Sequence, residues 1–158
     1  MENNNGLDSS MMNQILKGDA FPDDESGAFL TNSINTFFEE LFSHTDQTKS
    51  SIIRDANIPR TYGYQILNGS RIAHRDYYLR IAIAMKLDLR TTQRLLAVTQ
   101  TGELHSLIRR DAAIMFAINH EYDNIQTYDF MLKLGVAPLE KDETGDEPGK
   151  SDQSDTDE

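Results

Sequence analysis

The apolar positions of the chain recur at helical spacing in its middle and are sparse at both ends. From residue 30 to residue 139, apolar side chains return every three or four positions, which places them on one face of a helix. The first stripe begins at Leu30, with Thr31 as its expected cap, and runs to Phe42. No segment alternates apolar and polar residues long enough to predict a strand. The pattern therefore predicts an all-α fold.

Further helices are expected along the rest of this stretch. Residues 77–85 are apolar over most of the circumference of a helix, which predicts a buried central helix. Thr91 is expected to cap a shorter helix that stops at Thr101-Gly102. Apolar stripes over residues 107–120 and 124–134 then predict a second helical pair.

Charge divides the chain into three parts. Residues 1–47 contain nine acidic and one basic residue, residues 48–110 eleven basic and four acidic, and residues 111–158 thirteen acidic and three basic. The net charges of these parts are −8, +7 and −10, which together give the −11 of the chain. A basic middle is the charge pattern that contact with phosphates requires. The polar, acidic ends, residues 1–27 and 140–158, are predicted to be disordered.

Residues 48–69, inside the basic part, predict two short helices joined by a tight turn. Thr48 is expected as an N-cap, and Asn57 occupies the turn, where a positive φ is needed. Pro59 is expected to begin the second helix, and Asn68-Gly69 to end it. This is the layout of a helix-turn-helix, which presents its second helix to the major groove of DNA.

Residues 48–87 resemble the Xre/lambda-repressor-like helix-turn-helix family. The matching features are Thr48-Lys49, Ile58, Gln65-Ile66-Leu67-Asn68-Gly69, Ser70-Arg71 and the run Leu79-Arg80-Ile81-Ala82-Ile83-Ala84-Met85. The ending Gly135-Val136-Ala137-Pro138-Leu139 is similar to that of Gram-positive bacterial regulators with an appended helical pair. The resemblance implies a compact five-helix DNA-binding domain at residues 28–100, followed by an appended C-terminal helical pair at residues 101–139.

The chain departs from the family at three positions. Ile53 stands where a small residue is usual and Gly63 where a branched one is usual, so we expect the two to face each other and conserve volume. A glycine inside the second helix costs about 1 kcal/mol of helix stability. Leu67 replaces the usual acidic residue before Asn-Gly.

The resemblance also implies which residues contact DNA. Arg60, Thr61 and Tyr64 are expected to contact bases. The residues expected to contact phosphates are Thr48, Lys49, Gln65, Asn68, Arg71 and Arg75. Tyr62 is instead expected in the core, and Arg54 and Arg80 as ordinary solvated charges. Arg109-Arg110 is interpreted as an internal ion pair with Asp111 rather than as a further backbone contact.

The first functional interpretation is a cytoplasmic bacterial transcription regulator, a repressor that binds double-stranded DNA as a dimer through residues 59–68. The appended pair has apolar residues to spare, and these either form a dimer or partner surface or complete the core of the monomer. They are Met115, Phe116, Tyr128, Phe130 and Met131. The alternative is a protein-interaction adaptor or inhibitor that keeps the fold but acts through its acidic or C-terminal surfaces, which Gly63 and the acidic ends favour.

Other classes of function find no support in the sequence. No nucleophile stands with a base, and no glycine-rich loop is present to cradle phosphates, so we expect no enzyme. The chain has no cysteine and only four scattered histidines, so we expect no metal site and no cofactor. We also expect no membrane contact, because the sequence contains no long apolar run and no signal peptide.

Overall fold

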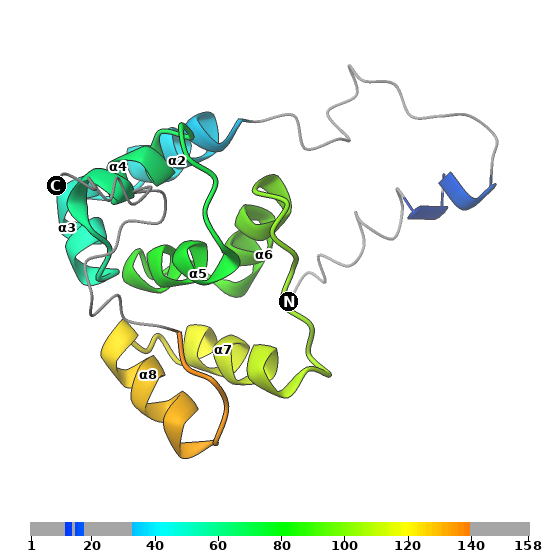
Figure 1. The fold of residues 1–158 in the computed structure, drawn as a ribbon. Helices are drawn as coiled ribbons and strands as arrows, with labels where there is room; N and C mark the ends of the chain where they lie inside the picture. Colours follow the sequence, from blue (N-terminus) through cyan, green and yellow to red (C-terminus); the bar gives the residue numbers. More distant parts are fainter. Residues whose placement is uncertain (1–11, 14, 18–32, 140–158) are drawn as a thin grey trace, which may run out of the picture.

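The computed structural model describes residues 12, 13, 15–17 and 33–139, and it is all-helical over them (Figure 1). Within residues 33–139 the helices are α2 (Ile34–Ser43), α3 (Lys49–Asp55), α4 (Arg60–Leu67), α5 (Arg75–Ala84), α6 (Leu89–Val98), α7 (Arg109–Asn119) and α8 (Asn124–Lys133). The predicted all-α class is confirmed for this part of the chain. Residues 12, 13 and 15–17 are helical, whereas the rest of the acidic ends predicted as disordered lies outside the described residues, as do Leu30 and Thr31.

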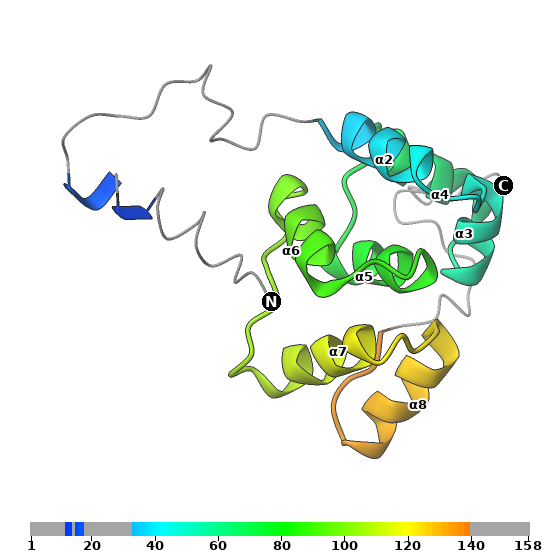
Figure 2. The ribbon, with the colours of Figure 1, turned by 180° about the vertical axis from the view of Figure 1, so that it is seen from behind.

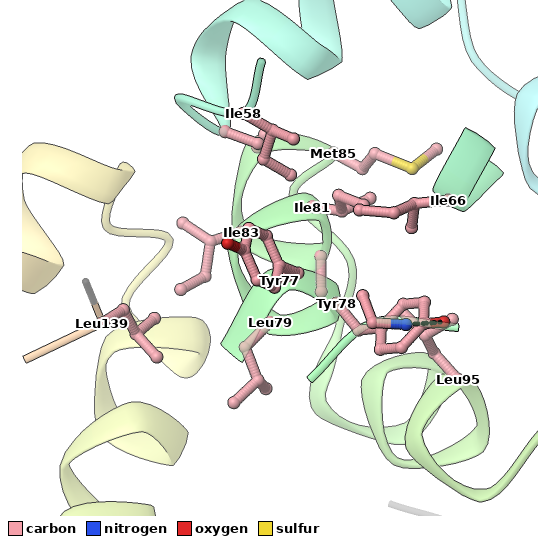
Figure 3. Packing of buried hydrophobic residues seen from close by; sticks show 14 of the residues in the cluster. Ile58, Ile66, Tyr77, Tyr78, Leu79, Ile81, Ile83, Met85, Leu95 and Leu139 are labelled. Atoms are coloured by element: carbon pink, nitrogen blue, oxygen red, sulfur yellow. Dashed lines mark hydrogen bonds between the residues drawn. The ribbon is translucent and has the colours of Figure 1, made fainter. Parts of the chain in front are cut away.

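Helix α5 lies in the middle of the helical body. Helices α2 and α4 lie on one side of it, and α7 and α8 lie on the other (Figures 1 and 2). Helix α5 contacts α3, α6 and α8, and α6 also contacts α2 and α7. Every residue of α5 from Tyr77 to Ala84 is buried, which confirms the predicted central helix. Figure 3 shows its side chains leaving in different directions, with Ile66 of α4, Leu95 of α6 and Leu139 around them.

Four helices begin at a side chain that accepts a hydrogen bond from a backbone N–H of the first turn. Ser33 caps α2, Thr48 caps α3, Asp88 caps α6 and Asp123 caps α8. Each such cap stabilises a helix by about 1 kcal/mol. The prediction for α6 was wrong, because Thr91 donates its N–H to Asp88 and the helix begins at Leu89.

Most helices end through one backbone motif, in which the residue after the C-cap has a positive φ. Asn57, Lys86, Gln100 and Glu121 adopt it after α3, α5, α6 and α7, and Gly135 after α8. At each site the next residue donates its N–H back to the helix; for example, Leu87 donates to the carbonyl of Ala82 at 3.0 Å. These backbone hydrogen bonds provide donors for carbonyls that would otherwise have no partner at the end of a helix.

The appended pair shares its core with the rest of the body. Leu104, Ile114, Met131 and Leu139 belong to one apolar cluster with the buried residues of α2 to α6. Asn124, at the start of α8, donates to the carbonyls of Asp55 and Arg80. Helices α7 and α8 are therefore part of one packed body with α5.

Arg80 does not lie where the sequence analysis expected it. We predicted a solvated charge, but Arg80 is buried, with its guanidinium carbon 4.6 Å from the centroid of the Tyr77 ring. Its Nη1 donates to the carbonyl of Asn57 in the turn between α3 and α4. The side chain thus links the central helix to that turn. None of the described helices is both long and apolar enough to cross a membrane.

Candidate nucleic-acid interface

Helices α3 and α4 and the turn between them follow the predicted geometry closely. Thr48 caps α3 by accepting the N–H of Ser51 at 3.1 Å, and Asn57 has a φ of 55°. Helix α4 begins at Arg60, one residue later than predicted, because Pro59 has an extended ψ of 135° and occupies the N-cap position. The C-cap Asn68 and the positive φ of Gly69 confirm the predicted end of α4.

Helix α4 has one buried and one open face. Its buried residues are Tyr62, Gly63, Ile66 and Leu67. Tyr62 lies in the core as predicted, with its ring edge-on to Tyr77. The side chains predicted to contact bases or phosphates lie on the rest of the surface. Arg60, Thr61 and Asn68 are exposed, and Tyr64 and Gln65 are half-buried.

Gly63 faces Ile53 across the pair, as the sequence predicted. A Cβ atom on Gly63 would lie 2.6 Å from Cγ2 and 2.7 Å from Cγ1 of Ile53, closer than side-chain carbons approach each other. The isoleucine on α3 therefore fills the space that a side chain on α4 would need. The glycine in α4 is explained by the distance at which the two helices pack.

The start of α4 favours an anion. Helix α4 has no acidic residue in its first turn, no side chain caps it, and Arg60 is its first residue. The N-terminal end of a helix carries a partial positive charge and backbone N–H groups without an intrahelical partner. Such ends bind phosphate readily.

Arg60 is exposed and lies one turn before Tyr64, with its guanidinium carbon 5.8 Å from the centroid of the Tyr64 ring. A cation over an aromatic face at this distance is held weakly, by about 0.5–1 kcal/mol at an exposed site. The contact orients Arg60 along the open face of α4 and leaves its N–H groups able to donate to a ligand.

Lys49 forms an ion pair with Glu39 of α2. Both side chains are partly exposed, and such surface pairs contribute at most about 1 kcal/mol. A phosphate near the start of α3 can therefore compete with Glu39 for the ammonium group.

The loop after α4 is fixed by its own hydrogen bonds. The Asn68 side chain accepts the N–H of Ser70 at 2.8 Å, and the N–H of Arg71 returns to the carbonyl of Gln65. The Tyr78 hydroxyl accepts the N–H of Ala73 at 3.1 Å, the hydrogen bond drawn in Figure 3. Burial raises the pKa of Tyr78 above its ordinary 10.0, so this hydroxyl stays neutral. The core thus holds the loop that presents the exposed Arg71.

Arg75, predicted to contact phosphate, lies instead in a bidentate ion pair with Asp111 of α7. The two nitrogen–oxygen distances are 2.7 and 3.2 Å, and Asp111 is 1% exposed. Asp111 also accepts the N–H of His105 at 2.9 Å. The guanidinium of Arg75 is thus engaged inside the protein.

Arg110 makes the reciprocal pair with Asp76 of α5, at 2.8 and 3.1 Å. It also donates to the carbonyls of Ala137 and Pro138. The expected pairing of Arg109-Arg110 with Asp111 was therefore wrong in its partners, because Asp111 takes Arg75, Arg110 takes Asp76, and Arg109 donates to the carbonyl of Leu134. Both α5 and α7 carry an Arg-Asp dipeptide in their first turn, and that repetition was the available sequence signal.

The residues predicted either as a dimer or partner surface or as part of the core differ in exposure. Met131 is fully buried and completes the core, while Met115, Tyr128 and Phe130 are half-buried. Phe116 is exposed and lies stacked between the rings of His120 and Phe130. Ile125 and Leu132 were not among the predicted surface residues, although they are more exposed than any of these five.

No family model matches the chain, and no curated protein and no solved structure does so either. The resemblance to the Xre/lambda-repressor-like family therefore remains a prediction from the motifs. Within the described residues, no group of three or more His, Asp or Glu side chains is arranged to hold a metal ion.

Proposed function

We propose that the protein is a sequence-specific double-stranded DNA-binding regulator of transcription, in which α3 and α4 form a helix-turn-helix within a lambda-repressor-like domain of α2 to α6. The observation that carries this proposal is the open face of α4, which begins with Arg60 and continues with Thr61 and Tyr64. Helix α3 begins at Lys49, and the loop after α4 carries the exposed Arg71. The proposal is supported by the exposed cation and hydrogen-bond donors of this face and by the start of α4, which has no acidic residue in its first turn.

In this proposal, the guanidinium of Arg60 donates hydrogen bonds to O6 and N7 of a guanine. Thr61 and Tyr64 contact the edges of neighbouring bases. Phosphates are bound by Thr48, Lys49, Gln65, Asn68 and Arg71, which fixes the register of the helix in the groove. Arg75 is left out of the contact set, because its pair with Asp111 gives it a structural role. A single module reads few base pairs, so the regulator, a repressor in our interpretation, acts as a dimer on a two-fold site.

Selection of binding sites from a randomised duplex pool, followed by fluorescence anisotropy on the selected site, tests the proposal. We expect the full chain to enrich one sequence, with an affinity that falls steeply as salt rises. Arg60→Ala should weaken binding about 10-fold to 100-fold, since a bidentate base contact is worth about 1–3 kcal/mol. The matched control is Arg94→Ala, which removes an exposed arginine of α6 outside the proposed interface. Failure to enrich any sequence, or equal losses in the two variants, would contradict the proposal.

A second candidate is a protein-interaction adaptor that uses the same fold without binding DNA. The observation that favours it is the distribution of exposed apolar side chains in the body. Residues 33–100 expose only Ile72, whereas residues 101–139 expose Leu107, Ile108, Phe116, Ile125 and Leu132. An adaptor would enrich no DNA sequence, and its binding to a partner would depend on these residues and not on Arg60.

A further inference from the structure

Helix α8 is apolar on two sides of its surface. Thr127 and Met131 are buried against the body, whereas Ile125 and Leu132 on the outer side are 63% and 51% exposed. Residues seven apart lie on the same side of a helix, and Tyr128 stands between these two. We call Ile125, Tyr128 and Leu132 the α8 ridge. A helix with apolar residues on its outer side is expected to be covered there by another element.

A second group of exposed apolar residues lies near the N-terminus. Residues 12, 13 and 15–17 are helical, and we call them the N-terminal turn. Met12, Ile15 and Leu16 are 60%, 53% and 74% exposed. Their spacing of three and four residues places all three on one face. A helix this short is marginal in water by itself, and packing on an apolar surface would stabilise it.

The two groups fit each other in size and in chemistry. Among the described residues, large exposed apolar side chains gather only in the N-terminal turn and in residues 101–139, with Ile72 alone between them. The side chains of Ile125 and Leu132 offer far less area than the roughly 800 Å² per partner that a standard dimer interface buries. The ridge therefore suits a short helical segment better than a second folded copy.

The connection between the two is long enough. Residues 18–32 join the N-terminal turn to Ser33, and a chain of this length can span roughly 50 Å. A folded body of about 100 residues has a radius of gyration of only about 13 Å. The turn can therefore reach any face of the body of its own chain.

We propose that the N-terminal turn docks on the α8 ridge of the same chain, with Met12, Ile15 and Leu16 covering Ile125 and Leu132. This contact removes both exposed apolar groups from water without a second molecule. It lies on the side of α5 away from α4, so it leaves the proposed DNA interface open (Figures 1 and 2).

Paramagnetic labelling of the full chain tests this contact and does not depend on DNA binding. The chain contains no cysteine, so Asn13→Cys accepts a single nitroxide beside the apolar face of the turn. We expect the label to broaden the backbone amide signals of α8 and to leave those of α4 sharp. Leu16→Asp in the labelled chain should restore the α8 signals, as should Leu132→Asp. Ile72→Asp, an exposed apolar residue away from the ridge, should leave the broadening unchanged.

Several results would overturn the proposal. These are an absence of broadening at α8, broadening that persists in Leu16→Asp, and broadening centred on another helix. A mixture of nitroxide-labelled chains and isotope-labelled chains without nitroxide distinguishes docking within one chain from docking on a second copy. Broadening in that mixture would show that the turn docks on a second copy, which contradicts docking within one chain.

Discussion

The helix pairs α3–α4 and α7–α8 both contribute buried apolar side chains to the core around α5, but α7 also makes ion pairs with α5. Within the α3–α4 pair, Ile53 fills the place of a side chain at Gly63. The α7–α8 pair is fastened to α5 by two crossed ion pairs, Arg75 with Asp111 and Arg110 with Asp76. The basic residues near α7 are thus used inside the protein, whereas Arg60 and Arg71 remain exposed beside α4. The net charge of residues 48–110 therefore overstates the positive charge that is available at the surface.

Asp111→Ala should cause a large loss of stability, because it leaves the partly buried Arg75 without its carboxylate. Loss of one member of a buried pair destabilises by about 3 kcal/mol or more. Urea denaturation measures the effect. The matched control is Asp55→Ala, which breaks the exposed pair with Arg54 and should cost under about 1 kcal/mol. Equal losses in both variants would contradict the distinction drawn between internal and surface pairs.

Gly63→Ala should destabilise the α3–α4 pair, although alanine is the better helix former. The helix gains about 1 kcal/mol, but forcing a methyl group into a packed contact costs about 1–3 kcal/mol. The net loss should therefore be about 1 kcal/mol in thermal or urea unfolding.

A double-mutant cycle isolates this steric cause. Ile53→Ala alone should destabilise by about 2–5 kcal/mol, since it leaves a cavity. In that background Gly63→Ala should stabilise, because both Ile53 carbons nearest the new Cβ are gone. If Gly63→Ala is destabilising in both backgrounds, the contact with Ile53 is not the cause.

Asp88 should give the smallest effect, a pH dependence at the start of α6. Hydrogen bonds from the side chain and N–H of Thr91, aided by the charge of Arg90, hold the pKa of Asp88 below its ordinary 3.8. Its charged form thus stabilises the folded state at pH values above about 4, and this contribution disappears as the pH falls through the folded-state pKa. Asp88→Asn keeps a capping side chain but removes its charge. The free energy of unfolding should therefore depend less on pH between about pH 5 and pH 2 in this variant. If the free energy of unfolding falls equally with decreasing pH in the unaltered protein and in Asp88→Asn, Asp88 does not have this role.

The sequence predicted local features of the fold well, because they depend on neighbouring residues. The cap at Thr48 and the turn at Asn57 are such features, and the Ile53–Gly63 contact followed from two departures that offset each other. The cap of α6 was misplaced because Asp88 and Thr91 are both good capping residues and lie three positions apart.

Features that depend on tertiary packing could not be predicted in the same way. Arg75 and Asp111 are 36 residues apart, and only the packing of α7 beside the start of α5 brings them together. Helical spacing also did not separate the inner from the outer side of α8. As a result, surface and core stayed open as alternatives for Met131, and Ile125 and Leu132 were missed.

The most direct test of the central claim is a cycle between Arg60 and guanine N7 in the selected DNA site. Replacing each guanine in turn by 7-deazaguanine removes the acceptor and leaves the base pair intact. We expect one position at which this change weakens binding of the unaltered protein about 10-fold and has no effect on binding of the Arg60→Ala variant. If the two changes are additive at every guanine, Arg60 does not read the base, and the assignment of α4 as the recognition helix is wrong.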